Sequence, residues 1–193
     1  MSTNRNHMSF EVAKKVLDEV AREFDASQIL ICITGGEPLL NKELFKIIDY
    51  SSRLDFSCGI TTNGTLLTSA VGKQLKEAGL DTISISLDGL EKTHNDFRCK
   101  PRAFRLAMEG IQNAKKAGLD PEVVTVVHKG NLKELDILYE SCARMKLLPG
   151  KLQTWTQSAG QKKTRQCFLT HMNTRCFSIL SNEFDSIQAT PWK

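Results

Sequence analysis

The chain has 193 residues, a length that fits one domain better than two. A composition of 40% hydrophobic and 25% charged residues is typical of a globular protein and excludes a largely disordered, collagen-like or membrane-embedded chain. The net charge of +4 arises at the end of the chain, because residues 145–193 carry seven Lys or Arg against two Asp or Glu. These basic residues form no run and do not alternate with aromatic residues. We therefore expect neither a nucleic acid nor a membrane as partner.

The cysteines favour a reducing, cytoplasmic setting over a disulfide scaffold. No signal-peptide pattern precedes them, and the longest aliphatic run, residues 29–33, is far shorter than the roughly 20 residues that span a bilayer. No two cysteines have a CxxC spacing, so the sequence contains no strong local zinc or redox motif. The six cysteines are Cys32, Cys58, Cys99, Cys142, Cys167 and Cys176.

Apolar residues at helical spacing predict helices along most of the chain. Ser9 and Thr68 are suitable N-caps, Gly79 is a suitable left-handed end to the helix that Thr68 begins, and Asn131 with Glu134 resembles a capping box. The predicted helices begin near Ser9, Asn41, Thr68, Pro101 and Asn131.

Between these helices, short apolar or alternating runs predict strands at residues 29–33, 56–61, 82–87 and 123–127, with a last strand around Trp155. Strands that alternate with amphipathic helices indicate right-handed βαβ crossovers and a parallel sheet. The predicted fold class is therefore α/β.

The two faces of the predicted strands differ, which bears on the kind of sheet. In residues 82–88, Ile83, Ile85 and Leu87 share one face, and two serines and an aspartate share the other. A sheet covered by helices on both faces would carry apolar residues on both, whereas a barrel with a solvated, ligand-holding lumen tolerates this alternation. We prefer a partial (β/α) barrel. The alternative is a set of edge strands in an open sheet.

The carboxyl ends of the predicted strands carry glycine and small polar residues. They read TGGEP at 34–38, TTNG at 61–64, SLDG at 86–89 and HKGN at 128–131. Ligands in parallel α/β folds collect at this edge, and glycine allows close approach to the backbone. The pattern predicts a polar small-molecule site.

Each of these ends also has a structural interpretation when it is taken alone. TGGEP could be a tight turn in which Glu37 caps backbone amides, and Asn63-Gly64 is a common turn dipeptide. Ser86 and Asp88 could simply end a strand, and His94 and His128 read as loop residues. The functional interpretation depends on the occurrence of several such ends in order on one sheet.

The motifs TGGEPLL, TTNGTLL and SISLDGLEKTHNDFR, followed by the Asn131 helix, resemble those of the radical S-adenosylmethionine (radical SAM) superfamily, in particular its peptide-modifying and cofactor-maturase branch with a GGEP motif. The resemblance runs from Ile33 to about Ala159. It implies a partial (β/α)6 TIM-like barrel that uses SAM and a [4Fe–4S] cluster. Such oxidoreductase-type enzymes cleave SAM reductively to a 5′-deoxyadenosyl radical, which abstracts hydrogen from a peptide or small-molecule substrate.

The resemblance also implies roles for individual residues. Gly35, Gly36, Glu37 and Pro38 would hold the SAM ammonium group. Ser86 and Arg98 would contact the SAM carboxylate, for which a hydroxyl and a guanidinium fork are suitable partners. Asn63 and Asp88 would lie near the ribose. Alternatively, Arg98 is a solvated loop charge. No catalytic residue and no metal ligand is assigned. The cofactor-binding set is Gly35, Gly36, Glu37, Pro38, Asn63, Ser86, Asp88 and Arg98.

The sequence departs from the family in one respect: it contains no CxxxCxxC motif, which in the family holds the [4Fe–4S] cluster. The motif would lie before Met1, so we expect a barrel that lacks its first strand and cluster loop, as in a fragment, or else a natural cluster-free paralogue. We expect residues 1–160 to form the radical SAM-like core, with strands 2 to 6, and residues 161–193 to form a divergent, basic, helical tail.

Three functional hypotheses follow. The first is a radical SAM enzyme, or a fragment of one, that takes electrons from a partner such as ferredoxin or flavodoxin and is inactive as the present chain alone. The second is a non-catalytic SAM-fold module that binds a partner. The third is an unrelated barrel lyase or isomerase.

Overall fold

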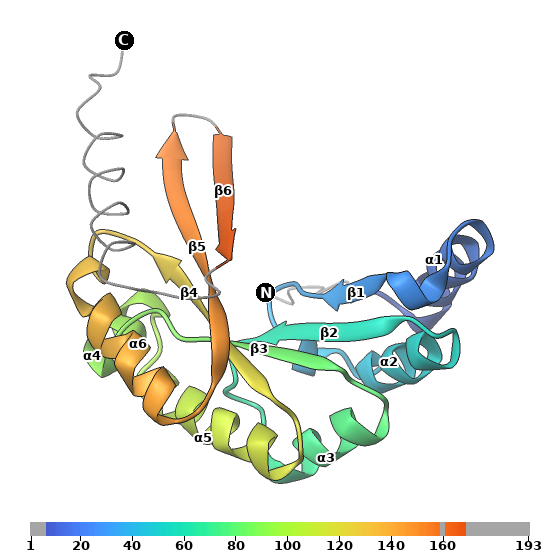
Figure 1. Cartoon of the computed structure of the whole chain (residues 1–193), viewed down its shortest axis with the longest axis horizontal. Helices are drawn as coiled ribbons and strands as arrows, with labels where there is room; N and C mark the ends of the chain where they lie inside the picture. Colours follow the sequence, from blue (N-terminus) through green and yellow to red (C-terminus); the bar gives the residue numbers. More distant parts are fainter. Residues whose placement is uncertain (1–6, 159–160, 169–193) are drawn as a thin grey trace, which may run out of the picture.

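The computed structural model describes residues 7–158 and 161–168, with side chains described through residue 147 (Figure 1). None of the helices in these ranges is long and apolar enough to cross a membrane. The α-helices are α1 (Phe10–Glu23), α2 (Leu44–Arg53), α3 (Ser69–Glu77), α4 (Glu91–Phe97), α5 (Ala103–Lys116) and α6 (Leu135–Arg144). The strands are β1 (Leu30–Ile33), β2 (Ser57–Thr62), β3 (Thr82–Ser86), β4 (Pro121–Val127), β5 (Leu148–Ser158) and β6 (Gln161–Phe168). Short 3₁₀ helices lie at Ala26–Gln28, Pro38–Leu40 and Leu132–Glu134.

The strands form one sheet in the order β1-β2-β3-β4-β5-β6. Each neighbouring pair from β1 to β5 is parallel, and β6 runs antiparallel to β5. The sheet curves as part of a barrel wall does, with α2, α3 and α5 along its outer side (Figure 1). The prediction of an α/β partial barrel is confirmed.

The core lies between the sheet and the outer helices. The strand face that the alternation assigned to the core is buried, with Ile83 and Ile85 fully inaccessible to solvent and Cys58 and Ile60 beside them. Burying an aliphatic side chain of this size contributes about 1.5–3 kcal/mol. This layer therefore fixes the register of the strands and so places their carboxyl ends next to one another.

Two predicted helix starts are confirmed by their caps. The Ser9 hydroxyl accepts the N–H of Val12, and the Thr68 hydroxyl accepts the N–H of Val71. Gly79, with φ +90°, follows α3 in the left-handed conformation expected of it.

The capping box proposed at Asn131 is wrong. The Asn131 side chain forms no cap bond to the helix and instead bonds to β4 and to the segment after β3, while Glu134 bonds to the start of α4. Helix α4 was not predicted from its seven residues, because only His94 is buried among them and no apolar stripe reveals it.

The expected helical tail is wrong for the part that the structure describes. Residues 161–168 form β6, which pairs with β5 from Lys151–Phe168 to Ser158–Gln161. Strand β5 pairs with β4 along one edge, and β6 supplies hydrogen-bond partners for the backbone groups of its other edge. The boundary expected at residue 160 therefore falls inside a hairpin. Residues 169–193 lie outside the described residues.

Candidate functional site

The loop after β1 presents open backbone at the carboxyl edge of the sheet. Gly35 and Gly36 are exposed, and a Cβ built at either would meet no atom within 4 Å. Gly35 has φ +155°, a conformation that side chains with a Cβ rarely adopt. Pro38, which is buried, begins a short 3₁₀ helix and so ends the open stretch. The loop leaves room for a ligand to approach the main chain directly.

A groove of 890 Å³ lies along this loop, between α1, β1 and the start of α2. Gly35, Gly36, Glu37 and Pro38 line it at one end, and apolar side chains such as Val16, Leu17 and Ile31 line much of the rest. Asn63, Ser86, Asp88 and Arg98 do not line it. The groove therefore includes only the GGEP part of the predicted site.

The Glu37 carboxylate joins the ends of β1 and β2. Its Oε1 accepts the Thr62 hydroxyl at 2.6 Å and the N–H of Leu39 at 3.1 Å, and its Oε2 accepts the N–H of Asn63 at 2.8 Å. The structural interpretation of TGGEP, in which Glu37 caps a backbone amide, is thus confirmed. Both carboxylate oxygens already have partners. The Glu37 carboxylate therefore has a structural task at this edge, and the ammonium-binding role of the motif stays a prediction.

Asn63 lies beside Glu37, where the ends of β1 and β2 meet. Its backbone N–H goes to Glu37, and its side-chain oxygen accepts the N–H of Thr65 at 2.9 Å. The residue is half-buried, and its side-chain NH₂ group has no hydrogen-bond partner among the described residues. The Asn63 side chain can therefore donate a hydrogen bond to a ligand at the carboxyl end of β2.

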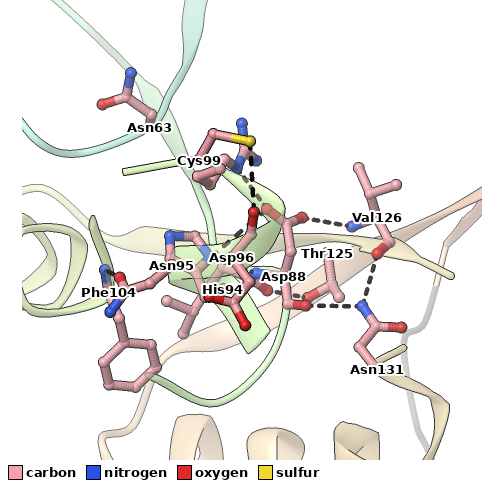
Figure 2. A network of polar contacts seen from close by, with 12 residues as sticks. Asn63, Asp88, His94, Asn95, Asp96, Cys99, Phe104, Thr125, Val126 and Asn131 are labelled. Atoms are coloured by element: carbon pink, nitrogen blue, oxygen red, sulfur yellow. Dashed lines mark hydrogen bonds and ion pairs between the residues drawn. The ribbon is translucent and has the colours of Figure 1, made fainter. Parts of the chain in front are cut away.

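Asp88 is the centre of a second polar cluster, at the ends of β3 and β4 (Figure 2). Its side chain is fully buried. Its Oδ2 accepts Nε of Arg98 at 2.6 Å, and its Oδ1 accepts the N–H of Val126 at 2.9 Å. A buried carboxylate needs such partners, since an uncompensated charge in the interior is costly. The structure brings Asp88 and Arg98 together directly.

Arg98, at the end of α4, uses only one of its nitrogens for this contact. Its side chain is 31% exposed, and its terminal nitrogens have no hydrogen-bond partner among the described residues. Arg98 is therefore not simply a solvated loop charge. Ser86 is half-buried, and its hydroxyl likewise has no partner among those residues. Ser86 and Asp88 lie two residues apart at the end of a strand, so their side chains leave the same face.

The sequence analysis missed several members of the Asp88 cluster. Asn131 is fully buried, and its amide donates to the backbone oxygens of Asp88 and Val126, both at 2.8 Å (Figure 2). Its Oδ1 accepts the N–H of His128 at 2.9 Å. His94 Nδ1 accepts the N–H of Asp88 at 2.9 Å. Asn131 stood in the HKGN end but was given only a capping role, and His94 was interpreted as a loop residue, so neither was predicted as a site residue.

Glu134 ties the loop after β3 to the start of α6. Its carboxylate accepts the Leu90 N–H at 2.8 Å and the Thr93 hydroxyl at 2.6 Å. Gly89 has φ +146°, and a Cβ there would lie 2.8 Å from the Glu134 carboxylate. A residue larger than glycine would push this bond apart.

Burial favours the neutral form of both histidines of the cluster, because it lowers the pKa of each ring. Burial lowers the pKa of His94, although the nearby Asp88 carboxylate opposes the shift, and Nδ1 accepts a hydrogen bond, so the proton lies on Nε2. Burial also lowers the pKa of His128, whose Nδ1 accepts the N–H of Gly130. The His128 ring stacks on Phe97 with centroids 4.5 Å apart, and its Nε2 is buried without a hydrogen-bond partner among the described residues.

The described residues fit SAM better than they fit an iron–sulfur cluster. Exposed glycine carbonyls, the Arg98 terminal nitrogens and the Ser86 hydroxyl are suitable for an amino acid group. No group of three His, Cys, Asp or Glu side chains in the described ranges could hold a metal ion. Burial raises the pKa of the Cys58 thiol to about 12 and that of Cys142 to about 11, which disfavours the thiolate form that binds iron.

The fold resembles that of a solved structure. The structure of native anSMEcpe with bound AdoMet has a TM-score of 0.66 to this chain at 19% identity, covering 83% of this chain and 48% of the other. At that identity, the likeness concerns the fold alone.

Curated sequences are also similar. The AdoMet-dependent heme synthase of Oleidesulfovibrio alaskensis is 32% identical over 139 residues, which is 72% of this chain and 35% of that protein. The GTP 3′,8-cyclase of Thermodesulfovibrio yellowstonii is 39% identical over 124 residues, 62% of this chain and 37% of that protein. The chain thus spans little more than a third of the length of these relatives. The family model described as "Radical SAM superfamily" matches residues 2–140. The chain belongs to the radical SAM superfamily.

Proposed function

We propose that this chain is the SAM-binding core of a radical SAM enzyme. The observation that carries the proposal is the combination, at one edge of the sheet, of open glycine backbone and a partly exposed arginine whose terminal nitrogens have no partner among the described side chains. In this superfamily, SAM supplies the radical that abstracts hydrogen from the substrate. Membership of the family sets aside the third hypothesis, an unrelated barrel lyase or isomerase.

The residues of this chain would act as a holder for the amino acid and ribose parts of SAM. The exposed carbonyls of Gly35 and Gly36 accept from the ammonium group, while Arg98 and Ser86 donate to the carboxylate. The side-chain NH₂ group of Asn63, which has no partner within the described part of the chain, is suitable for a ribose hydroxyl. Asp88, which is fully buried with both oxygens occupied, has a different role from the ribose contact that the resemblance suggested.

The proposal is tested by equilibrium dialysis of the full chain against radiolabelled SAM. Gly36→Ala is the sharpest variant, because its Cβ meets nothing within 4 Å and should leave the melting temperature unchanged. We expect this methyl group to occupy ligand space and raise the Kd for SAM about tenfold. Ser57→Ala, an exposed position at the other end of β2, is the matched control. A wild-type chain that binds no SAM would overturn the proposal.

The reaction of the whole enzyme is a further part of the proposal. We expect hydrogen abstraction from a peptide or small molecule, with electrons from a partner such as ferredoxin or flavodoxin. The sequence contains no CxxxCxxC motif, and no three suitable ligands converge among the residues that the structure describes, so we expect the chain alone to form no 5′-deoxyadenosine after anaerobic iron–sulfur reconstitution and reduction. Formation of 5′-deoxyadenosine by the chain alone would contradict this expectation.

The second candidate function is a SAM-fold module that binds a partner without radical chemistry. It is favoured by the same observation, that no three suitable ligands converge within the described residues. Such a module should bind its partner equally well before and after iron is added, whereas the core of an enzyme should not. A partner pull-down with and without iron reconstitution separates the two.

A further inference from the structure

We infer that Asp88 is a positioning residue that holds the Arg98 guanidinium ready for the carboxylate of an amino acid ligand. This inference rests on the proposed function, because it assigns a task to Asp88 in the same SAM site. It differs from a ligand contact, since Asp88 reaches the ligand only through Arg98.

Burial and hydrogen bonding prevent Asp88 from serving as a direct contact. The side chain is 0% exposed, and each carboxylate oxygen already accepts one donor, Arg98 Nε or the Val126 N–H. The backbone on either side of this carboxyl is also fixed, because the Asp88 N–H donates to His94 and its carbonyl oxygen accepts from Asn131. The aspartate is therefore immobile and inaccessible to a ligand.

The ion pair with Asp88 leaves the terminal nitrogens of Arg98 available for a ligand. A guanidinium group has five N–H donors, and Asp88 takes the one on Nε. The two terminal nitrogens, which form the fork suited to a carboxylate, have no partner among the described residues. An arginine that used its terminal nitrogens for Asp88 would have no fork left to offer.

A second contact limits the remaining freedom of Arg98. Its Cζ lies 5.8 Å from the centroid of the Phe97 ring, and Phe97 in turn stacks on His128. Arginine has many rotamers in solution, and a ligand that must order such a side chain binds less tightly. Because Nε is bound to Asp88, the Arg98 side chain is already ordered, and the ligand loses less binding free energy to ordering it.

The network also joins four segments at the edge of the sheet. Asp88 belongs to the end of β3, Val126 to β4, and Asn131 to the loop before α6, while Arg98 ends α4. The position of the guanidinium is thus set by the register of β3 and β4. The ion pair with Asp88 then fixes the Arg98 side chain relative to these strands.

Binding of two ligands to the full chain tests the inference. SAM carries the amino acid group, whereas 5′-methylthioadenosine has the same nucleoside but no carboxylate. Asp88→Asn places an amide NH₂ or a weaker acceptor against Arg98 Nε. We expect this change to raise the Kd for SAM about tenfold, as the loss of a well-placed charge-assisted bond does, and to leave the Kd for 5′-methylthioadenosine within about twofold of wild type.

A double-mutant cycle separates positioning from general damage. Arg98→Ala should raise the Kd for SAM at least as much as Asp88→Asn, and the double variant should bind SAM no more weakly than Arg98→Ala alone. Additive losses, or an equal loss of 5′-methylthioadenosine binding, would show a merely structural role. If Asp88→Asn fails to fold, Arg98→Lys serves instead: it keeps a cation for Asp88 but loses the fork, so SAM affinity should fall about tenfold.

Failure of the inference differs visibly from failure of the proposed function. If wild type binds SAM and Asp88→Asn binds it equally well, the positioning role is overturned while the SAM site stands. If wild type binds no SAM, the proposed function fails and the inference fails with it.

Discussion

Two carboxylates lie at the same edge of the sheet but differ in their burial and in their hydrogen-bond partners. Glu37, after β1, is half-buried and accepts only neutral donors: one hydroxyl and two backbone N–H groups. Asp88, after β3, is fully buried and accepts a guanidinium as well as a backbone N–H. The first shapes a loop whose glycines face outward, and the second orients a charge. An acidic residue at a strand end can thus stabilise the conformation of a loop, or it can fix the position of another charged side chain. Its burial and the charge of its hydrogen-bond partner determine which of these roles it has.

The comparison predicts that Asp88 contributes more to stability than Glu37. Asp88→Ala should lower the free energy of unfolding by about 3–5 kcal/mol, because it leaves Arg98 and the Val126 N–H without their acceptor. Urea unfolding measures the change. Asp96→Ala is the matched control, since Asp96 lies on α4 in an exposed ion pair with Lys92 and should cause no measurable change. Equal effects at Asp88 and Asp96 would contradict the prediction.

Asn131 should follow Asp88 in importance, because three bonds meet at its fully buried side chain. Asn131→Ala should cost about 2–3 kcal/mol, since the backbone oxygens of Asp88 and Val126 lose a donor in the interior. The same urea titration measures the effect, with the exposed Gln112→Ala as control. A loss as small as that of the control would show that water replaces the amide.

Glu37→Ala should destabilise the fold less, by about 1–2 kcal/mol, because its site is partly open to water and its partners are neutral. A cycle with Thr62→Val sharpens the comparison: the two changes together should cost less than the sum of their separate effects, since they remove the same bond. Strict additivity would show that the Glu37–Thr62 contact contributes nothing. Glu77→Ala, an exposed position on α3, is the control.

The pH dependence should separate the two regions further. His94 belongs to the Asp88 cluster, and burial lowers its pKa below the unfolded value of about 6.5. As the pH falls below that value, the unfolded chain takes up the proton first. Stability should therefore decrease towards low pH by at most about 1.4 kcal/mol per pH unit for this group.

Urea unfolding between pH 7.5 and pH 5 tests this expectation. His94→Gln keeps an acceptor for the Asp88 N–H but cannot take up a proton, so its pH dependence should be flatter than that of wild type. Parallel curves for the two proteins would place the pH dependence elsewhere, for example at His128, whose pKa is also lowered by burial.

Much of the fold could be predicted from residue patterns. The alternation of Ile83, Ile85 and Leu87 with polar residues predicted the buried face, and the cap residues Ser9 and Thr68 marked helix starts. Local chemistry of this kind depends on neighbours a few residues away. Helix α4 and strand β6 were missed because each depends on contacts beyond its own sequence: α4 is held by Asp88 and Glu134, and β6 by the free edge of β5.

The sequence by itself determined that strands and helices alternate and that glycine and small polar residues collect at the strand ends. It also contained the GGEP motif on which the resemblance to the radical SAM superfamily was based, and the family model over residues 2–140 confirmed that resemblance. Only the tertiary structure decided what each polar side chain bonds to. Asp88 meets Arg98 ten residues away, Val126 38 residues away and Asn131 43 residues away, so its partners depend on the register of neighbouring parallel strands. That register is set by packing of the apolar face across the whole sheet, which no local pattern specifies.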